Sequence, residues 1–221
     1  EEVIITASGG PFLKLPISKF KKIKPSSAIK HPNWNMGKKI SIDSATMMNK
    51  VFEVIEASKI FNVSLNKLSI LIHPSSYVHA LIKFNSGIIN IVAHDTTMKI
   101  PIFNTLYEDE NQKLDTKKLD IKILNNLRFD KINVKRYPMI NLLKYLPNKH
   151  SLYETVIVSA NDVLVELFLN EKIKFTDINK RLFKIIKLKE FMKFKKIYPT
   201  NIKDILNLNN YVRLKIIKKS V

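Results

Sequence analysis

Residues 31–57, HPNWNMGKKISIDSATMMNKVFEVIEA, constrain the fold more than any other stretch of this chain. Apolar and polar residues alternate over residues 38–43, as they do in a half-buried strand. Ser44 stands where a helix N-cap is preferred, and the apolar residues after it recur at helical spacing as far as Phe61. The sequence therefore predicts a loop, a short strand and a single helix in succession.

Polar side chains gather at the start of this predicted helix. Asn49 and Glu53 are four residues apart and Lys50 and Glu53 three, so the three side chains share one face. A hydroxyl at Ser44, an amide, an ammonium and the free N–H groups of a helix N-terminus suit an anion, and the carboxylate just beyond suits a divalent cation. The alternative is a capped amphipathic helix with an exposed Lys–Glu pair, and spacing alone favours that alternative.

The first hundred residues otherwise show the patterns of a sheet. We expect a buried strand at residues 2–6, which the paired glycines of the ASGGP turn break. Residues 12–30 lack a clean period and are rich in proline and lysine, which predicts a surface loop that moves as a lid. Strands are expected at 68–72, 77–84 and 87–93 as an antiparallel meander, with a short helix at 101–107.

The second half is mostly helical in pattern. Residues 108–135 are polar and charged, with one strand-like run at 119–124, and are the best candidate for an interdomain linker. Helices are predicted at 137–146, at 151–170, from Thr176 or Asp177, and from Asn201 onward. We therefore expect an α+β fold. An α/β domain at residues 1–107, with a mixed or antiparallel sheet and a mobile lid loop at 8–38, precedes a C-terminal four-helix bundle at 136–221.

Composition limits the possible partners. The formal net charge is +19, which would suit a binder of nucleic acid or of an anionic membrane. However, the chain has 34 lysines, spread along its length, and only four arginines, whereas nucleic-acid sites usually combine arginine with aromatic side chains. We expect no nucleic-acid partner. No stretch approaches the roughly 20 consecutive apolar residues of a membrane span, so we expect no membrane partner either. The absence of cysteine excludes disulfides and thiolate metal sites.

Five motifs in order give the chain a resemblance to a known family. They are SGGPF at residues 8–12, HPNW at 31–34, MGKKISIDSATMMNK at 36–50, EVIEA at 53–57 and IHPSSYVHA at 72–80. The chain resembles 1-deoxy-D-xylulose 5-phosphate reductoisomerase, and weaker similarity extends to the C-terminus. The resemblance implies an NADPH-dependent oxidoreductase and isomerase of the methylerythritol phosphate pathway of isoprenoid biosynthesis. Such an enzyme rearranges 1-deoxy-D-xylulose 5-phosphate and reduces the product to 2-C-methyl-D-erythritol 4-phosphate, assisted by Mg²⁺ or Mn²⁺.

The resemblance also implies roles for individual residues. The substrate phosphate would be held by Ser8, His31, Ser44, Asn49 and Lys50. Glu53 would bind the metal and, through it, the substrate, together with two carboxylates of an upstream Asp-x-Glu segment that this chain does not contain. The catalytic set would be His31, Trp34 and Glu53, with Trp34 closing over the substrate. Without the family, Ser8 would be an ordinary turn serine, and a surface location for His31 would be about as plausible as a functional one.

The cofactor side carries over less completely. Met36, Gly37 and Met98 would line the nicotinamide side, and Ser76 and His79 match residues near the active site. Thr96 and Thr97 stand where the family has Pro-Asp, which weakens this part of the match, and Val51 replaces a usual glycine. The chain has no glycine-rich dinucleotide fingerprint, so the family's NADPH-binding domain is expected to lie outside it.

The expected protein is thus the catalytic and C-terminal part of a longer enzyme, inactive as a fragment. The alternative is a non-catalytic relative that only binds phosphate or another anion. The family implies a homodimer. We expect a cytoplasmic location in a bacterium or endosymbiont, with a plastid as the alternative.

Overall fold

The computed structural model describes residues 2–31, 33–34, 36–107 and 112–220 of the chain. The first four residues of the predicted linker, 108–111, lie outside this part. The strands are β1 (Glu2–Ala7), β2 (Leu68–Ile72), β3 (Val78–Lys83), β4 (Ile89–Ala93) and β5 (Asp130–Lys131). The α-helices are α1 (Pro25–Ala28), α2 (Lys38–Thr46), α3 (Met48–Ile60), α4 (Lys99–Leu106), α5 (Ile121–Asn125), α6 (Tyr153–Leu169), α7 (Phe175–Ile186), α8 (Lys189–Met192) and α9 (Ile202–Ser220). The 3₁₀ helices are η1 (Ile17–Lys22), η2 (Leu65–Lys67), η3 (Pro138–Tyr145) and η4 (Lys193–Lys196).

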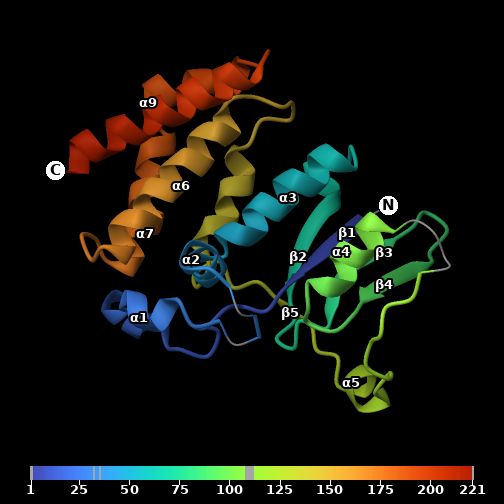
Figure 1. Cartoon of the computed structure of the whole chain (residues 1–221). Helices are drawn as coiled ribbons and strands as arrows, with labels where there is room; N and C mark the ends of the chain where they lie inside the picture. The colour runs from blue at the N-terminus through green and yellow to red at the C-terminus, as the bar shows by residue number, and fades with distance from the viewer. Residues whose placement is uncertain (1, 32, 35, 108–111, 221) are drawn as a thin grey trace.

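The strands form one mixed sheet in the order β4-β3-β1-β2-β5. β1 is central, pairing parallel with β2 and antiparallel with β3. The predicted meander is therefore wrong, because β1 separates β2 from β3 and only the β3–β4 hairpin has the expected pairing. A parallel pair needs a long crossover connection, and residues 8–67, with α2 and α3, provide it. As Figure 1 shows, α3 lies between this sheet and the C-terminal helices.

The predicted strand at residues 38–43 and the single helix after it are wrong. Residues 38–46 form helix α2, and α3 begins only after Met47, whose φ of 68° places it in the left-handed region. The two helices consequently run in different directions (Figure 1). Ser44 is not an N-cap: it lies in the last turn of α2, where its carbonyl accepts the Met47 amide. Six alternating residues were too few to establish a strand. The ion pair of Lys39 with Asp43, whose charged atoms are 2.7 Å apart, has the i,i+4 spacing of a helix.

Residues 12–30 are less exposed than predicted. They contain η1 and α1, and Phe12, Phe20, Ile23 and Ala28 are buried in the main core. The rings of Phe12 and Phe20 meet that of Phe175 on α7 edge to face, with centroids 5.5 and 6.0 Å apart. Apolar residues without a regular period can still be buried when short helices and turns place them individually, so the prediction of a surface loop is wrong for this part. The closing motion of a lid stays a prediction.

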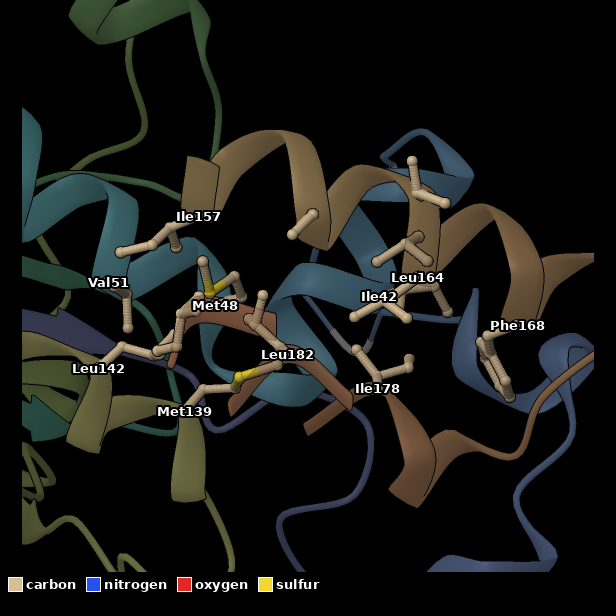
Figure 2. Close-up of a cluster of buried hydrophobic side chains, with 14 of the residues drawn as sticks. Ile42, Met48, Val51, Met139, Leu142, Ile157, Leu164, Phe168, Ile178 and Leu182 are labelled. Carbon is tan, nitrogen blue, oxygen red and sulfur yellow. The ribbon is translucent and has the colours of Figure 1, made fainter. Parts of the chain in front are cut away.

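The core continues from the sheet side into the C-terminal helices. Figure 2 shows Ile42 of α2 beside Leu164 of α6, and Met48 of α3 near Met139 and Leu182. Helix α6 forms where residues 151–170 predicted it, and α7 and α9 correspond to two further predicted helices, whereas 137–146 contains a 3₁₀ helix and the strand-like run at 119–124 contains α5.

The α+β class, with a mixed sheet and C-terminal helices, is confirmed. The division at 107 and 136 stays a prediction. None of the described helices is long and apolar enough to cross a membrane.

Candidate functional site

A cavity of about 610 Å³ lies at the carboxyl end of β1, next to the start of α3. Ligands often bind at the carboxyl ends of strands in open sheets. The residues that line the cavity are Thr6, Ala7, Ser8, Gly9, His31, Trp34, Met36, Ile40, Ser44, Met47, Asn49, Lys50, Glu53, Ser76, His79, His94, Met98 and Pro101.

Nearly all of the site residues predicted from the sequence meet there. Ser8, His31, Trp34, Met36, Ser44, Asn49, Lys50, Glu53 and Met98 all line the cavity. Gly37 is outside this lining. It is the N-cap residue of α2, and its carbonyl accepts the backbone N–H (3.1 Å) and the hydroxyl (2.9 Å) of Ser41. The tertiary structure thus brings together residues from a turn, a loop, two helices and the segment after β4, whereas Gly37, next to Met36 in the chain, does not line the cavity.

The turn after β1 presents Ser8. Gly9 and Gly10 have φ angles of 87° and 65°, which side chains rarely allow. The turn is fixed from outside by Tyr137, whose hydroxyl donates to the Gly9 carbonyl at 2.7 Å. Burial raises the pKa of Tyr137 to about 12, so this hydroxyl keeps its proton. The SGGPF sequence is therefore a rigid corner and not only a chain reversal.

The side chains of His31 and Ser8 form a hydrogen bond in which the histidine ring is the donor. The His31 Nδ1 accepts the backbone N–H groups of Asn33 and Trp34, at 3.2 and 3.0 Å, so the neutral ring carries its proton on Nε2. Nε2 lies 3.1 Å from the Ser8 Oγ, which also accepts the Gly10 amide at 3.0 Å. With two donors already directed at its oxygen, the Ser8 hydroxyl has its own proton left to donate to a ligand.

Burial, and after it the charge of Lys50, lower the pKa of His31 from 6.5. The ring is consequently neutral at pH 7, as its hydrogen bonds require. His31 therefore contributes a fixed N–H donor near the cavity, not a second positive charge.

The amino end of α3 supplies the polar floor of the cavity. No side chain among the described residues caps this helix, and Asn49 and Lys50 lie in its first turn, where backbone N–H groups lack helical partners. Asn49 Nδ2 donates to the Glu53 Oε1 at 2.9 Å, and Lys50 Nζ is 2.5 Å from the Glu53 Oε2. The residues of the predicted anion pocket therefore line one cavity at a helix N-terminus, with Ser44 contributed by the preceding helix, and anion binding there stays a prediction.

Three aromatic rings also line the cavity. His79 on β3 stacks on His94, with ring centroids 3.7 Å apart, and Trp34 meets His79 edge to face at 6.3 Å. Burial lowers the pKa of His79, so its ring is neutral at pH 7. Sequence reasoning missed Thr6 and His94. Thr6 was read only as part of a strand, and the proximity of His94 to His79 depends on the β3–β4 pairing.

The described part of the chain supplies only some of the donors that a metal ion needs. Among the described residues that line the cavity, Glu53 provides the one carboxylate, an oxygen donor of the kind that Mg²⁺ and Mn²⁺ prefer. In the described ranges, no group of three or more histidine, aspartate or glutamate side chains could hold a metal ion. Glu53 is thus suited to contribute one ligand, and further ligands would have to come from elsewhere.

Comparison with known proteins places this geometry in context. The family model described as the 1-deoxy-D-xylulose 5-phosphate reductoisomerase C-terminal domain matches residues 1–61, and the model described as the DXP reductoisomerase C-terminal domain matches residues 95–215. The 1-deoxy-D-xylulose 5-phosphate reductoisomerase of Pelagibacter ubique is 58% identical over 221 residues, which is all of this chain and 57% of that protein. The corresponding protein of Persephonella marina is 39% identical over 93% of this chain and 54% of its own length.

Solved structures that resemble this chain belong to the same family. A DOX-P reductoisomerase in complex with NADPH, fosmidomycin and magnesium superposes with a TM-score of 0.89 at 32% identity, over 99% of this chain and 54% of that one. The 1-deoxy-D-xylulose 5-phosphate reductoisomerase of Zymomonas mobilis in complex with NADPH gives a TM-score of 0.84 at 31% identity, over 99% and 55%. The chain therefore spans just over half the length of these relatives.

Proposed function

The chain belongs to the 1-deoxy-D-xylulose 5-phosphate reductoisomerase family, and from this premise we propose that it is the catalytic and C-terminal part of such an enzyme. The proposed reaction is the rearrangement of 1-deoxy-D-xylulose 5-phosphate followed by reduction with NADPH to 2-C-methyl-D-erythritol 4-phosphate, in isoprenoid biosynthesis. The observation that carries the proposal is the meeting of Ser8, His31, Ser44, Asn49 and Lys50 around one cavity at a helix N-terminus.

The phosphate group of the substrate is assigned to the amino end of α3. A phosphate dianion takes several N–H and O–H donors together with a cation. Ser8 and Ser44 offer hydroxyls, Asn49 an amide and Lys50 an ammonium, and the helix dipole favours negative charge at this position. The neutral Nε2–H of His31 orients Ser8, so that the serine hydroxyl donates to the phosphate.

Glu53 is assigned to the metal ion, and Lys50 links the two sites. Both carboxylate oxygens of Glu53 are engaged within the chain, one by Asn49 and one by Lys50. A phosphate offers these two donors a new partner, so phosphate binding and release of Glu53 to the cation go together in this proposal. Mg²⁺ or Mn²⁺ would supply Lewis-acid polarisation of the substrate oxygens, and NADPH would supply the hydride.

The remaining walls orient the substrate and exclude water. Trp34 and Met36, from the loop before α2, and Met98, before α4, give the cavity apolar surface on the side assigned to the nicotinamide ring. A place for Gly37 in cofactor binding has no support from the cavity lining.

A homodimer is part of the proposal. β4 is an edge strand, and its residues are exposed, with Ile89, Ile91 and Val92 at 56, 51 and 45%. An apolar edge strand is prone to pair with a second copy, which supports the sheet as the contact between protomers. The expected cytoplasmic location, and the absence of nucleic-acid and membrane partners, stay predictions.

The test is turnover by the full-length gene product with NADPH and Mn²⁺. We expect Glu53→Gln to reduce kcat/KM at least about a hundredfold, since a neutral amide is a poor ligand for a hard cation. Lys50→Met should raise KM for the phosphorylated substrate more than for its dephosphorylated analogue. Unchanged kcat/KM in Glu53→Gln would remove the metal assignment, and an equal effect of Lys50→Met on both substrates would remove the phosphate assignment.

The second candidate, a relative that binds anions without catalysis, predicts a different result. It would bind the sugar phosphate at the same cavity but show no oxidation of NADPH. The pairing of Glu53 with Lys50 favours the enzyme, because an anion site that works without a metal gains nothing from a carboxylate 2.5 Å from its cation.

A further inference from the structure

A buried polar link joins α2 to α6 behind the cavity. Asp43 on α2 and Asn161 on α6 are 1 and 0% exposed. The Asn161 Nδ2 donates to the Asp43 Oδ1 at 2.8 Å, across 118 positions of sequence. Within the described residues the Asn161 Oδ1 has no hydrogen-bond partner, so the amide is held mainly through this one contact.

Lys39 completes the link from the solvent side. Its Nζ lies 2.7 Å from the Asp43 Oδ2 and 2.9 Å from the Asp162 Oδ1. Burial is the largest influence on Asp43 and raises its pKa, even though Lys39 and Asn161 oppose the shift. A buried carboxylate is rarely the most stabilising choice for a core, since apolar residues of similar volume often serve stability as well or better. The presence of this link therefore points to a role in specifying one arrangement.

The link acts on the part of α2 that faces the cavity. Successive residues of a helix differ in direction by about 100°, so Asp43 can face α6 while Ser44 faces the cavity. On its other side, the end of α2 is packed against the ASGGP turn: a Cβ on Gly10 would lie 3.0 Å from the Ser44 carbonyl oxygen. α2 is thus held between the turn that carries Ser8 and the Asp43–Asn161 contact.

Helix α2 needs such a restraint because α2 and α3 are two separate helices and not one continuous helix. Met47 ends α2 in the left-handed region, and α3 starts immediately after it in another direction. The position of the Ser44 hydroxyl relative to Asn49 and Lys50 is therefore determined by how α2 packs, not by helical spacing.

We propose that Asp43 and Asn161 are positioning residues for the anion site: their contact holds α2 so that the Ser44 hydroxyl stays beside Ser8 and the amino end of α3. Neither residue lines the cavity. The proposal rests on the phosphate-binding function proposed above and adds the α6 helix to the parts that determine it.

The test compares phosphate affinity with stability in the full-length gene product. Isothermal titration calorimetry measures the binding of inorganic phosphate and of 1-deoxy-D-xylulose 5-phosphate. Asp43→Ala, which removes the acceptor, and, separately, Asn161→Ala, which removes the donor, should each raise the Kd about tenfold, the equivalent of losing one well-placed hydrogen bond. The exchanged pair, Asp43→Asn with Asn161→Asp, re-creates a donor facing an acceptor and should return the Kd to within about threefold of the wild-type value.

Tyr153→Phe is the matched control. It also removes a buried hydrogen bond of α6, from the Tyr153 hydroxyl to the Ile186 carbonyl at 2.9 Å, but on the side of α7. It should lower Tm and leave the Kd unchanged.

The outcomes separate the two proposals. If the wild-type chain gives no saturable response to either phosphate, the proposed anion site is wrong and this inference falls with it. If the wild-type chain binds while Asp43→Ala and Asn161→Ala lower Tm but bind as well as Tyr153→Phe, the positioning role alone is overturned. A raised Kd in both single variants together with recovery in the exchanged pair supports it, and circular dichroism verifies that each variant is folded.

Discussion

Substitution of Gly10 by alanine tests how closely the turn after β1 is packed on α2. Gly10 has a φ of 65°, and an added Cβ would lie 3.0 Å from the Ser44 carbonyl oxygen and 3.2 Å from the Ala45 Cα. These are backbone atoms, so no flexible side chain can move aside. The turn, α2 or both must shift.

The expected cost has two parts. Placing an L-residue in the left-handed region costs about 1–2 kcal/mol. Forcing an extra methyl against fixed backbone adds about 1–3 kcal/mol, as overpacking of a core does. Gly87, in the turn between β3 and β4, has a similar φ of 87° but nothing within 4 Å of its added Cβ. Gly87→Ala should therefore show the conformational cost alone.

Urea unfolding of both variants separates the two contributions. The free energy of unfolding should be lower in Gly10→Ala than in Gly87→Ala by about 1–3 kcal/mol, with similar m-values. Gly10→Ala should also weaken phosphate binding, since Ser8 and Ser44 lie on the two sides of the contact. Equal destabilisation of the two variants, within about 0.5 kcal/mol, would refute the reasoning.

Two further results are expected. Because burial, and then Lys50, lower the pKa of His31 from 6.5, the unfolded chain binds more protons than the folded one just below pH 6.5. The free energy of unfolding should then fall as the pH drops below 6.5, and thermal unfolding of His31→Gln should lack this part of the pH dependence; an identical profile would contradict the assignment. Ile91→Lys, on the exposed edge strand β4, should shift the protein from dimer to monomer in sedimentation velocity without loss of Tm, and a wild-type monomer would remove the dimer proposal.

Much of the candidate site could be predicted because it depends on local spacing. Asn49, Lys50 and Glu53 share a face in any helix, and the structure places their side chains within hydrogen-bonding distance of one another. Helix α6 was equally predictable, since a run of apolar residues this long forms a buried helix wherever it packs. The family motifs added Ser8 and His31, which no spacing rule connects.

The errors occurred where distant contacts outweigh local pattern. Residues 38–46 form a helix because Ile42 packs against α6 and Asp43 bonds to Asn161 there, although the local alternation favoured a strand. β1 took the centre of the sheet because its residues pair on both edges, which sequence order did not indicate.

The sequence by itself determined the α+β class, most of the helices and strands, and the polar character of the start of α3, because these follow from periodicity and residue type within a few turns. Only the tertiary structure decided that Ser44 reaches this helix start from another helix, that His94 stacks on His79, and that Asn161 holds Asp43. These are contacts between residues far apart in the chain, and their free energy depends on how whole elements pack.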